Sequence, residues 1–245
     1  MAILGVWLGV AGRWTAGSEV GHPVRGVVAI IAATAPADDI FNGQFCGGVL
    51  ISRGQVLTAA HCVVGREAGS IHAVVGADNL CRQARIDGTR TQVLDIATHP
   101  RYDPRAGRYD LATLRLEDLM PAGWERNPVP HPGGEQHAIA LGWGRASAGG
   151  VPPCRLAQGR MTILPRAACE ARFDDGDRRF DATSMVCAVP AVPGGRDTCT
   201  GDSGGPLILG NDLDAGPVVG VVSWGRGCGV GWPGVFARAG AWPDR

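Results

Sequence analysis

The sequence of 245 residues contains no lysine, so its 23 basic residues are all arginine, and 23 acidic residues balance them. A net charge of zero, spread along the chain, argues against a nucleic-acid groove or an anionic-membrane surface. No apolar run approaches the roughly 18–20 residues that a membrane helix needs. The eight cysteines include no CxxC pair, which argues against zinc knuckles and thioredoxin-type redox sites.

Glycine and proline are abundant instead, with 38 and 17 residues. They follow no fixed period, which excludes collagen-like and low-complexity sequences. They separate short apolar segments, a pattern typical of an all-β protein. An even number of scattered cysteines indicates disulfides and an oxidising compartment, so we expect a secreted or extracytoplasmic protein.

Twelve candidate strands form two groups of six around a proline-rich segment. The first group is Val27–Thr34, Phe45–Ser52, Gln55–Ala59, His72–Gly76, Gln92–Thr98 and Leu111–Leu116. The second is His137–Trp143, Met161–Leu164, Met185–Ala188, Pro206–Leu209, Val218–Trp224 and Gly234–Arg238. Helical turns are expected only at Ala59–Val64 and Arg166–Arg172.

The proline-rich segment 120–136 cannot be a central strand or a helix interior, which makes it the natural linker. We therefore expect one barrel over residues 14–119 and another over 137–245. Two closed six-stranded antiparallel barrels would leave no exposed strand edges.

Residues 1–13 have a different character. Ala2–Ala11 is apolar and ends in a small-x-small pattern suited to signal peptidase, although no basic residue precedes it. We interpret residues 1–13 as a truncated signal peptide or propeptide. A first strand and a disordered tail are the alternatives.

Three short segments carry residue types suited to nucleophilic catalysis: Leu57–Cys62, Tyr109–Ala112 and Gly201–Pro206. A serine hydroxyl needs a base that takes its proton during attack, and histidine suits this step and the return of the proton. The imidazole in turn needs a buried carboxylate to fix its tautomer. His61, Asp110 and Ser203 are the candidates for base, carboxylate and nucleophile.

The glycines around the serine suit the same chemistry, because a tight turn can aim backbone N–H groups at an oxyanion. Gly201 and Ser203 would supply the two donors. Taken singly, each segment has an ordinary interpretation: a turn, a core histidine or a solvated aspartate. Their occurrence together, in this order, favours catalysis.

The segments TAAHC (58–62), DLATL (110–114) and GDSGGP (201–206) resemble the signature blocks of the chymotrypsin-like (trypsin-like) serine proteases. Phe45–Gly48, Gly142–Gly144 and Val222–Gly225 match as well, so the resemblance covers nearly the whole chain from Gly17 to Arg238. It implies a double β-barrel with the active site in the cleft, and a secreted endopeptidase made as a zymogen. The Ser-His-Asp triad would act through an acyl-enzyme.

The resemblance also assigns substrate-binding roles. Asp197 would form the floor of the primary pocket, with Thr198 beside it, and Gly225 and Gly234 would leave room for a long side chain. The implied specificity is cleavage after Arg or Lys. Ser223 would support Asp110 by a hydrogen bond. Together with Trp224 and Gly225, it would also pair with the substrate backbone as a short strand.

For the cysteines, the resemblance implies the pairs Cys46–Cys62, Cys169–Cys187 and Cys199–Cys228. Cys81 and Cys154 fall in two surface loops that lie side by side in such a fold, and we expect them to pair; two free thiols are the alternative. No cofactor or metal is expected. The loop that binds calcium in many relatives, here 77–88, offers only the carboxylates of Asp78 and Asp87.

Both ends of the chain depart from the family pattern. Activation in the family frees a new N-terminal ammonium, and a cut after Arg13 would give Trp14, whose ammonium would pair with Asp202. Trp14 replaces the usual branched aliphatic residue. We expect the usual C-terminal helix to be missing, because Pro243 leaves no room for it.

The expected partners are a protein or peptide substrate with Arg or Lys at the cleaved position and a protein inhibitor. Neither nucleic acid nor a membrane is expected as a partner. Two alternatives remain open. One is a serine protease of different primary specificity, and the other is a non-catalytic or unactivated binding module on the same fold.

Overall fold

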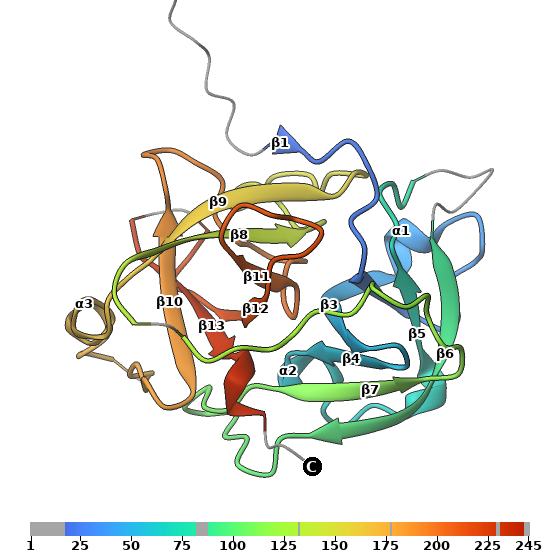
Figure 1. Ribbon diagram of the computed structural model, residues 1–245, viewed down its shortest axis with the longest axis horizontal. Coiled ribbons are helices and arrows are strands. Elements are labelled where there is room, and N and C mark those ends of the chain that lie inside the picture. Colours follow the sequence, from blue (N-terminus) through green and yellow to red (C-terminus); the bar gives the residue numbers. More distant parts are fainter. Residues whose placement is uncertain (1–17, 82–87, 132, 177, 229–230, 243–245) are drawn as a thin grey trace, which may run out of the picture.

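Twelve strands form two closed antiparallel barrels that lie side by side (Figure 1). The computed structural model describes residues 18–81, 88–131, 133–176, 178–228 and 231–242. Within these residues the helices are short, and none is both long and apolar enough to span a membrane. The all-β double-barrel fold expected from the sequence is confirmed.

The first barrel closes in the order β2-β3-β4-β7-β6-β5. Its strands are β2 (Val27–Ala32), β3 (Gln44–Ser52), β4 (Gln55–Thr58), β5 (Ile71–Val75), β6 (Thr89–Thr98) and β7 (Ala112–Leu116). All neighbouring strands in the ring are antiparallel.

The second barrel follows the order β8-β9-β10-β13-β12-β11 and closes because β11 also pairs with β8. Its strands are β8 (Gln136–Gly142), β9 (Ala157–Ile163), β10 (Met185–Pro190), β11 (Pro206–Leu209), β12 (Val218–Trp224) and β13 (Gly234–Arg238). The short strand β1 (Ser18–Glu19) adds to β9 outside the ring.

The helices are α1 (Ile40–Gly43), α2 (Ala60–Val63) and α3 (Arg166–Arg172), with 3₁₀ turns η1 (Ala68–Ser70) and η2 (Ala239–Ala241). Only α2 and α3 were expected. In α1 the Asp39 carboxylate caps the helix by accepting the Asn42 N–H at 3.4 Å. A four-residue helix is too short to show helical periodicity, which explains why the sequence gave no sign of it. Pro243, where no terminal helix was expected, lies outside the described residues.

The two barrels share a hydrophobic interface. In β2, Val28 and Ile30 belong to the interior of the first barrel, whereas Val27, Ala29 and Ile31 belong to a cluster that also contains Leu141, Ile208 and Val221 of the second. Because both faces of β2 are buried, its sequence is a continuous apolar run rather than an alternating one. This interface fixes the two barrels relative to each other.

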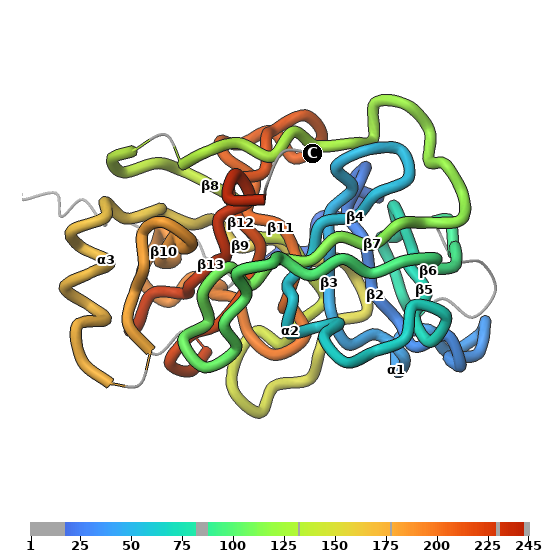
Figure 2. Tube along the Cα trace, turned by 90° about the horizontal axis from the view of Figure 1, so that it is seen from below, coloured from blue at the N-terminus to red at the C-terminus, as the bar shows by residue number. Residues whose placement is uncertain are grey.

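Segment 120–136 crosses from one barrel to the other (Figure 2). On the first barrel, Arg126 N–H donates to Leu50 O at 2.7 Å. On the second, Val129 N–H donates to Val218 O at 2.9 Å, and Val218 N–H donates to Asn127 O at 3.0 Å. At residues 126–129 the chain between β7 and β8 is therefore hydrogen-bonded to both barrels.

The eight cysteines form four disulfides, the same four pairs expected above: Cys46–Cys62, Cys81–Cys154, Cys169–Cys187 and Cys199–Cys228. Cys81–Cys154 links loops of the two barrels across 73 residues of sequence. The alternative, in which Cys81 and Cys154 are free thiols, is therefore wrong.

Candidate active site

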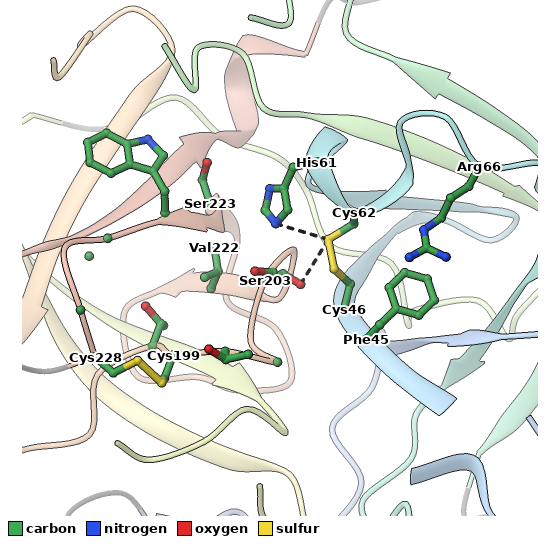
Figure 3. A pocket seen from close by; sticks show the side chains of 17 residues that line it. Phe45, Cys46, His61, Cys62, Arg66, Cys199, Ser203, Val222, Ser223 and Cys228 are labelled. Atoms are coloured by element: carbon green, nitrogen blue, oxygen red, sulfur yellow. Dashed lines mark hydrogen bonds between the residues drawn. A yellow bond between two sulfur atoms is a disulfide. The ribbon is translucent and has the colours of Figure 1, made fainter. Parts of the chain in front are cut away.

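A cavity of about 530 Å³ opens where the two barrels meet (Figure 3). The first barrel contributes Phe45 from β3 and His61 from α2, and the second contributes Ser203 and Ser223. His61 and Ser203, which are far apart in the sequence, thus line the same cavity.

Two hydrogen bonds join His61 to Asp110. The His61 Nδ1–H donates to Asp110 Oδ2 at 2.7 Å, and the His61 backbone N–H donates to Asp110 Oδ1 at 2.8 Å. The Asp110 side chain is 4% exposed, whereas that of His61 is 34% exposed and can reach the cavity. Two bonds to one carboxylate fix both the ring orientation and its tautomer.

Ser223, near the end of β12, donates its hydroxyl to Asp110 Oδ2 at 2.6 Å. Burial raises the pKa of the Asp110 carboxyl, but the bonds from His61 and Ser223 outweigh it and hold the pKa below its ordinary value. The carboxylate is therefore kept ionised beside the imidazole. The structure thus contains the hydrogen bond from Ser223 to Asp110 that was expected.

Tyr109, which precedes Asp110, has φ of 49°, a left-handed conformation that bulky residues rarely adopt. Its ring stacks on His99 with centroids 4.7 Å apart, and Arg101 lies over it at 4.1 Å. These contacts hold the unusual turn that points Asp110 at His61. Strained backbone of this kind is found where a functional side chain must be aimed.

Ser203 lies in the turn before β11. Its carbonyl accepts the Gly47 N–H at 2.7 Å, which ties the turn to β3. Cys62 Sγ lies 3.8 Å from His61 Nε2 and 3.7 Å from Ser203 O, so these residues surround one sulfur (Figure 3). In the part of the chain that the structure describes, no hydrogen bond joins Ser203 Oγ to His61 Nε2. Such bonds are often long in unliganded enzymes and tighten when substrate binds.

The turn also presents backbone N–H groups. Gly201 has φ of +98°, and a Cβ at this position would lie 2.9 Å from Gly144 Cα, so only glycine fits. Its carbonyl accepts from Gln44 Nε2 at 3.0 Å. Among the described residues, neither the Gly201 N–H nor the Ser203 N–H has a hydrogen-bond acceptor. Both donors are available to a ligand.

The rest of the cavity is lined by most of the residues expected in the primary pocket, namely Thr198, Ser223, Trp224, Gly225 and Gly234. Asp197 is buried, with 5% exposed, and is not among the lining residues. Its Oδ1 accepts the Thr198 N–H at 2.7 Å and would lie 3.3 Å from a Cβ added to Gly234. It therefore sits directly behind Thr198 and Gly234.

Asp202 contacts a residue that the sequence analysis missed. Arg196 Nη2 lies 3.3 Å from Asp202 Oδ1, and both side chains are buried. No spacing rule relates an arginine to a carboxylate six residues later in a loop, so the sequence offered no signal for this pair. Trp14, the expected partner of Asp202, lies outside the described residues, and that pairing stays a prediction.

Arg66 is a second residue that the sequence analysis missed. It lines the cavity with its guanidinium 4.2 Å from the centroid of the Phe45 ring. This contact places a positive charge at the rim of the cavity on the first barrel.

The described residues of the site do not offer a suitable set of metal ligands. Cys46, His61 and Cys62 place ligand-type atoms within 4.8 Å of one another, but both sulfurs belong to the Cys46–Cys62 disulfide and cannot bind as thiolates. Asp78 pairs with Arg155 at 2.6 Å, and Asp87 lies outside the described residues.

Comparison with known proteins agrees with this geometry. The family model described as Trypsin matches residues 26–242. The chain is 37% identical over 206 residues to a protein named trypsin from Saccharopolyspora erythraea, covering 82% of this chain and 85% of that protein. It is 35% identical to ovochymase-2 from Mus musculus and 36% identical to atrial natriuretic peptide-converting enzyme from Homo sapiens. These matches cover 77% and 80% of this chain but only 32% and 19% of those longer proteins.

Proposed function

This chain belongs to the trypsin family of serine proteases, and we propose that it is an endopeptidase that cleaves after Arg or Lys. In this proposal Ser203 is the nucleophile, His61 the general base and acid, and Asp110 the carboxylate that orients His61. The observation that carries it is the pair of hydrogen bonds from His61 to the buried Asp110, at the edge of the cavity that also contains Ser203.

The reaction starts when Ser203 Oγ attacks the substrate carbonyl carbon and His61 Nε2 takes the hydroxyl proton. The C–N bond then breaks, and the imidazolium gives that proton to the leaving amine. Water repeats the sequence on the acyl-enzyme, with His61 again as base, and frees the acid. Asp110 stabilises the imidazolium in both steps through the 2.7 Å bond to Nδ1.

The Gly201 and Ser203 N–H groups bind the oxyanion of each tetrahedral intermediate. Each such donor contributes about 2.7–4 kcal/mol to the transition state. The positive φ of Gly201 and its close fit against Gly144 support this role, because they fix the turn before substrate arrives.

In this proposal primary specificity comes from Asp197, whose carboxylate is buried behind Gly234 and Thr198, two residues that line the pocket. Opposite charges attract strongly where water is scarce, so this carboxylate favours an Arg or Lys side chain. Gly225 and Gly234 have no side chains that would fill the path to it. The backbone of Ser223–Gly225, where β12 ends, binds the substrate chain as an added strand.

The four disulfides support a secreted or extracytoplasmic location, where thiols are oxidised. Protein or peptide substrates and a protein inhibitor are the proposed partners. A non-catalytic binding module is less favoured, since His61, Asp110 and Ser203 are all present. In addition, His61 is hydrogen-bonded to Asp110.

Chromogenic substrates with arginine, lysine or phenylalanine at the cleaved position test the proposal, with Ser203→Ala as the control for a contaminating protease. We expect kcat/KM for the arginyl substrate to exceed that for the phenylalanyl substrate by at least about 100-fold, the size of a well-formed charge pair. Equal values would leave a serine protease of another specificity. No hydrolysis and no reaction of Ser203 with a fluorophosphonate would favour the binding module.

A further inference from the structure

Asp202 lies inside the oxyanion turn, between Gly201 and Ser203, which line the cavity. Only 2% of it is exposed. Its Oδ1 accepts the Gly144 N–H at 2.8 Å, and its Oδ2 accepts the Cys199 N–H at 3.0 Å. A Cβ on Gly142 or Gly144 would overlap this carboxylate, so the backbone of both residues packs directly against it.

Arg196 supplies the charge that this carboxylate needs. Its Nη2 lies 3.3 and 3.4 Å from the two carboxylate oxygens of Asp202 and also donates to Gly144 O at 2.8 Å. Arg196 is 7% exposed. Gly159 on β9 makes room for the backbone of Arg196, because a Cβ at that position would lie 2.7 Å from Arg196 O. One guanidinium thus fastens the oxyanion turn to the segment after β8.

The Asp202 carboxylate is buried away from water, so its negative charge needs the positive charge of Arg196 beside it. Burial raises the pKa of Asp202, and the Arg196 charge and the two backbone donors oppose that rise. Arg196, Asp197 and Asp202 are the charged residues lining a gap beside Gly142 and Gly159 that is too narrow for a water molecule. A buried carboxylate without a cation or water would drive its turn into another conformation.

We propose that Arg196 is the built-in counter-ion of Asp202 and holds the oxyanion turn in its working conformation, so that activity requires no newly cut N-terminus. The inference rests on the proposed function, since it concerns how the same site is switched on. In this proposal Arg196 takes the role that the resemblance assigned to the ammonium of Trp14. Arg196 is a positioning residue, because it acts on the site through Asp202 and Gly144.

The ion pair coexists with a formed site. With Asp202 held by Arg196, the cavity is open at about 530 Å³ and is lined by Thr198, Gly201 and Ser203. The N–H groups of Gly201 and Ser203 are not taken by other described residues. An arrangement in which Arg196 locks the protein in an inactive form would close the pocket or occupy these donors.

The first experiment uses the full chain with Arg13→Gln, which removes the expected activation cut. Its intact mass shows that the chain is unbroken, and a fluorophosphonate counts the reactive Ser203. We expect more than half of the molecules to be labelled and kcat/KM to stay within about threefold of the wild type. A reference protein beginning at Trp14, released from a fusion by a site-specific protease, is assayed in parallel.

The outcomes separate the two proposals. If the protein beginning at Trp14 is active and the unbroken Arg13→Gln chain is not, the built-in counter-ion is refuted and the protease assignment stands. If neither form is labelled at Ser203, the protease assignment fails, and the inference fails with it.

The second experiment changes Arg196 itself. We expect Arg196→Gln to lower kcat by at least about 100-fold, the effect of losing an oxyanion donor, while KM changes much less. Arg196→Lys, which keeps the positive charge, should recover at least a tenth of the activity. Arg160→Gln, an exposed site one residue after Gly159, is the matched control and should match the wild type. Unchanged or increased kcat in Arg196→Gln would overturn the proposal, and if that variant does not fold, the Arg13→Gln result decides.

Discussion

Replacing Ser223 by alanine tests the support of Asp110 with a change of one oxygen atom. Asp110 accepts three hydrogen bonds, at 2.8, 2.7 and 2.6 Å, and the shortest comes from Ser223 Oγ. A hydrogen bond to a buried charged group contributes about 1.5–3 kcal/mol. We therefore expect Ser223→Ala to lower the free energy of unfolding by that amount at pH 7.

The stability loss has a defined pH dependence. The folded protein holds the pKa of Asp110 below its ordinary value of 3.8, so this stabilisation is present above that value and disappears as the pH falls through the lower folded pKa. The difference between wild type and Ser223→Ala should thus be full at pH 7 and shrink below about pH 4. Urea unfolding with intact disulfides at several pH values measures it.

Catalysis should respond as well. If half of the lost energy is felt when the imidazolium of His61 forms, kcat falls about 4- to 12-fold, because 1.36 kcal/mol is tenfold in rate. The matched control is Ser184→Ala, since Ser184 Oγ is also buried and donates to a carboxylate, Asp181 Oδ2, at 3.2 Å. That control should lose stability without losing kcat. A Ser223→Ala enzyme with unchanged kcat, or a stability difference that grows in acid, would refute this reasoning.

Three further predictions follow from the same contacts. Asp110→Asn keeps the shape of the site but favours the wrong imidazole tautomer, so kcat should fall by about 10⁴-fold at nearly constant KM in steady-state kinetics; a loss below tenfold would contradict the role of Asp110. Asp197→Ser removes the charge behind Gly234 and should lower kcat/KM for an arginyl substrate by at least about 30-fold, equivalent to 2 kcal/mol, with little effect on a phenylalanyl substrate; equal losses on both would argue for a structural role. Replacing Cys81 and Cys154 together by serine opens a loop of 73 residues and should cost about 4 kcal/mol of unfolding free energy in denaturant titrations, with kcat preserved at 25 °C; an unchanged midpoint would show that the link adds no stability.

Most of the fold followed from the sequence because its strands are apolar and bounded by glycine or proline. Expectation and structure agree fully for Pro206–Leu209, Val218–Trp224 and Gly234–Arg238. Strand β1 was not expected, and among the twelve expected strands the largest boundary error is in β9, expected from Met161 but beginning at Ala157. Its first residues include the polar Gln158 and the flexible Gly159, which carry no strand signal. They belong to the strand because they pair with β8, and Gln158 also with β1.

The site was predictable to the extent that short segments signal chemistry. Resemblance placed His61, Asp110 and Ser203 in one cleft. In the structure His61 and Ser203 line one cavity, and Asp110 is hydrogen-bonded to His61. The Arg196–Asp202 pair had no such signal, because it depends on burial and on the space beside Gly159. Contacts of this kind exist only once the chain has folded.

Labelling of the intact protein by a fluorophosphonate, mapped by mass spectrometry, tests the central claim most directly. Only a serine whose proton can be taken by a nearby base reacts quickly. Modification at Ser203 alone is predicted, with a rate at least about 10³-fold lower in His61→Ala. Rapid modification of another residue, or an equal rate at Ser203 without His61, would contradict the account.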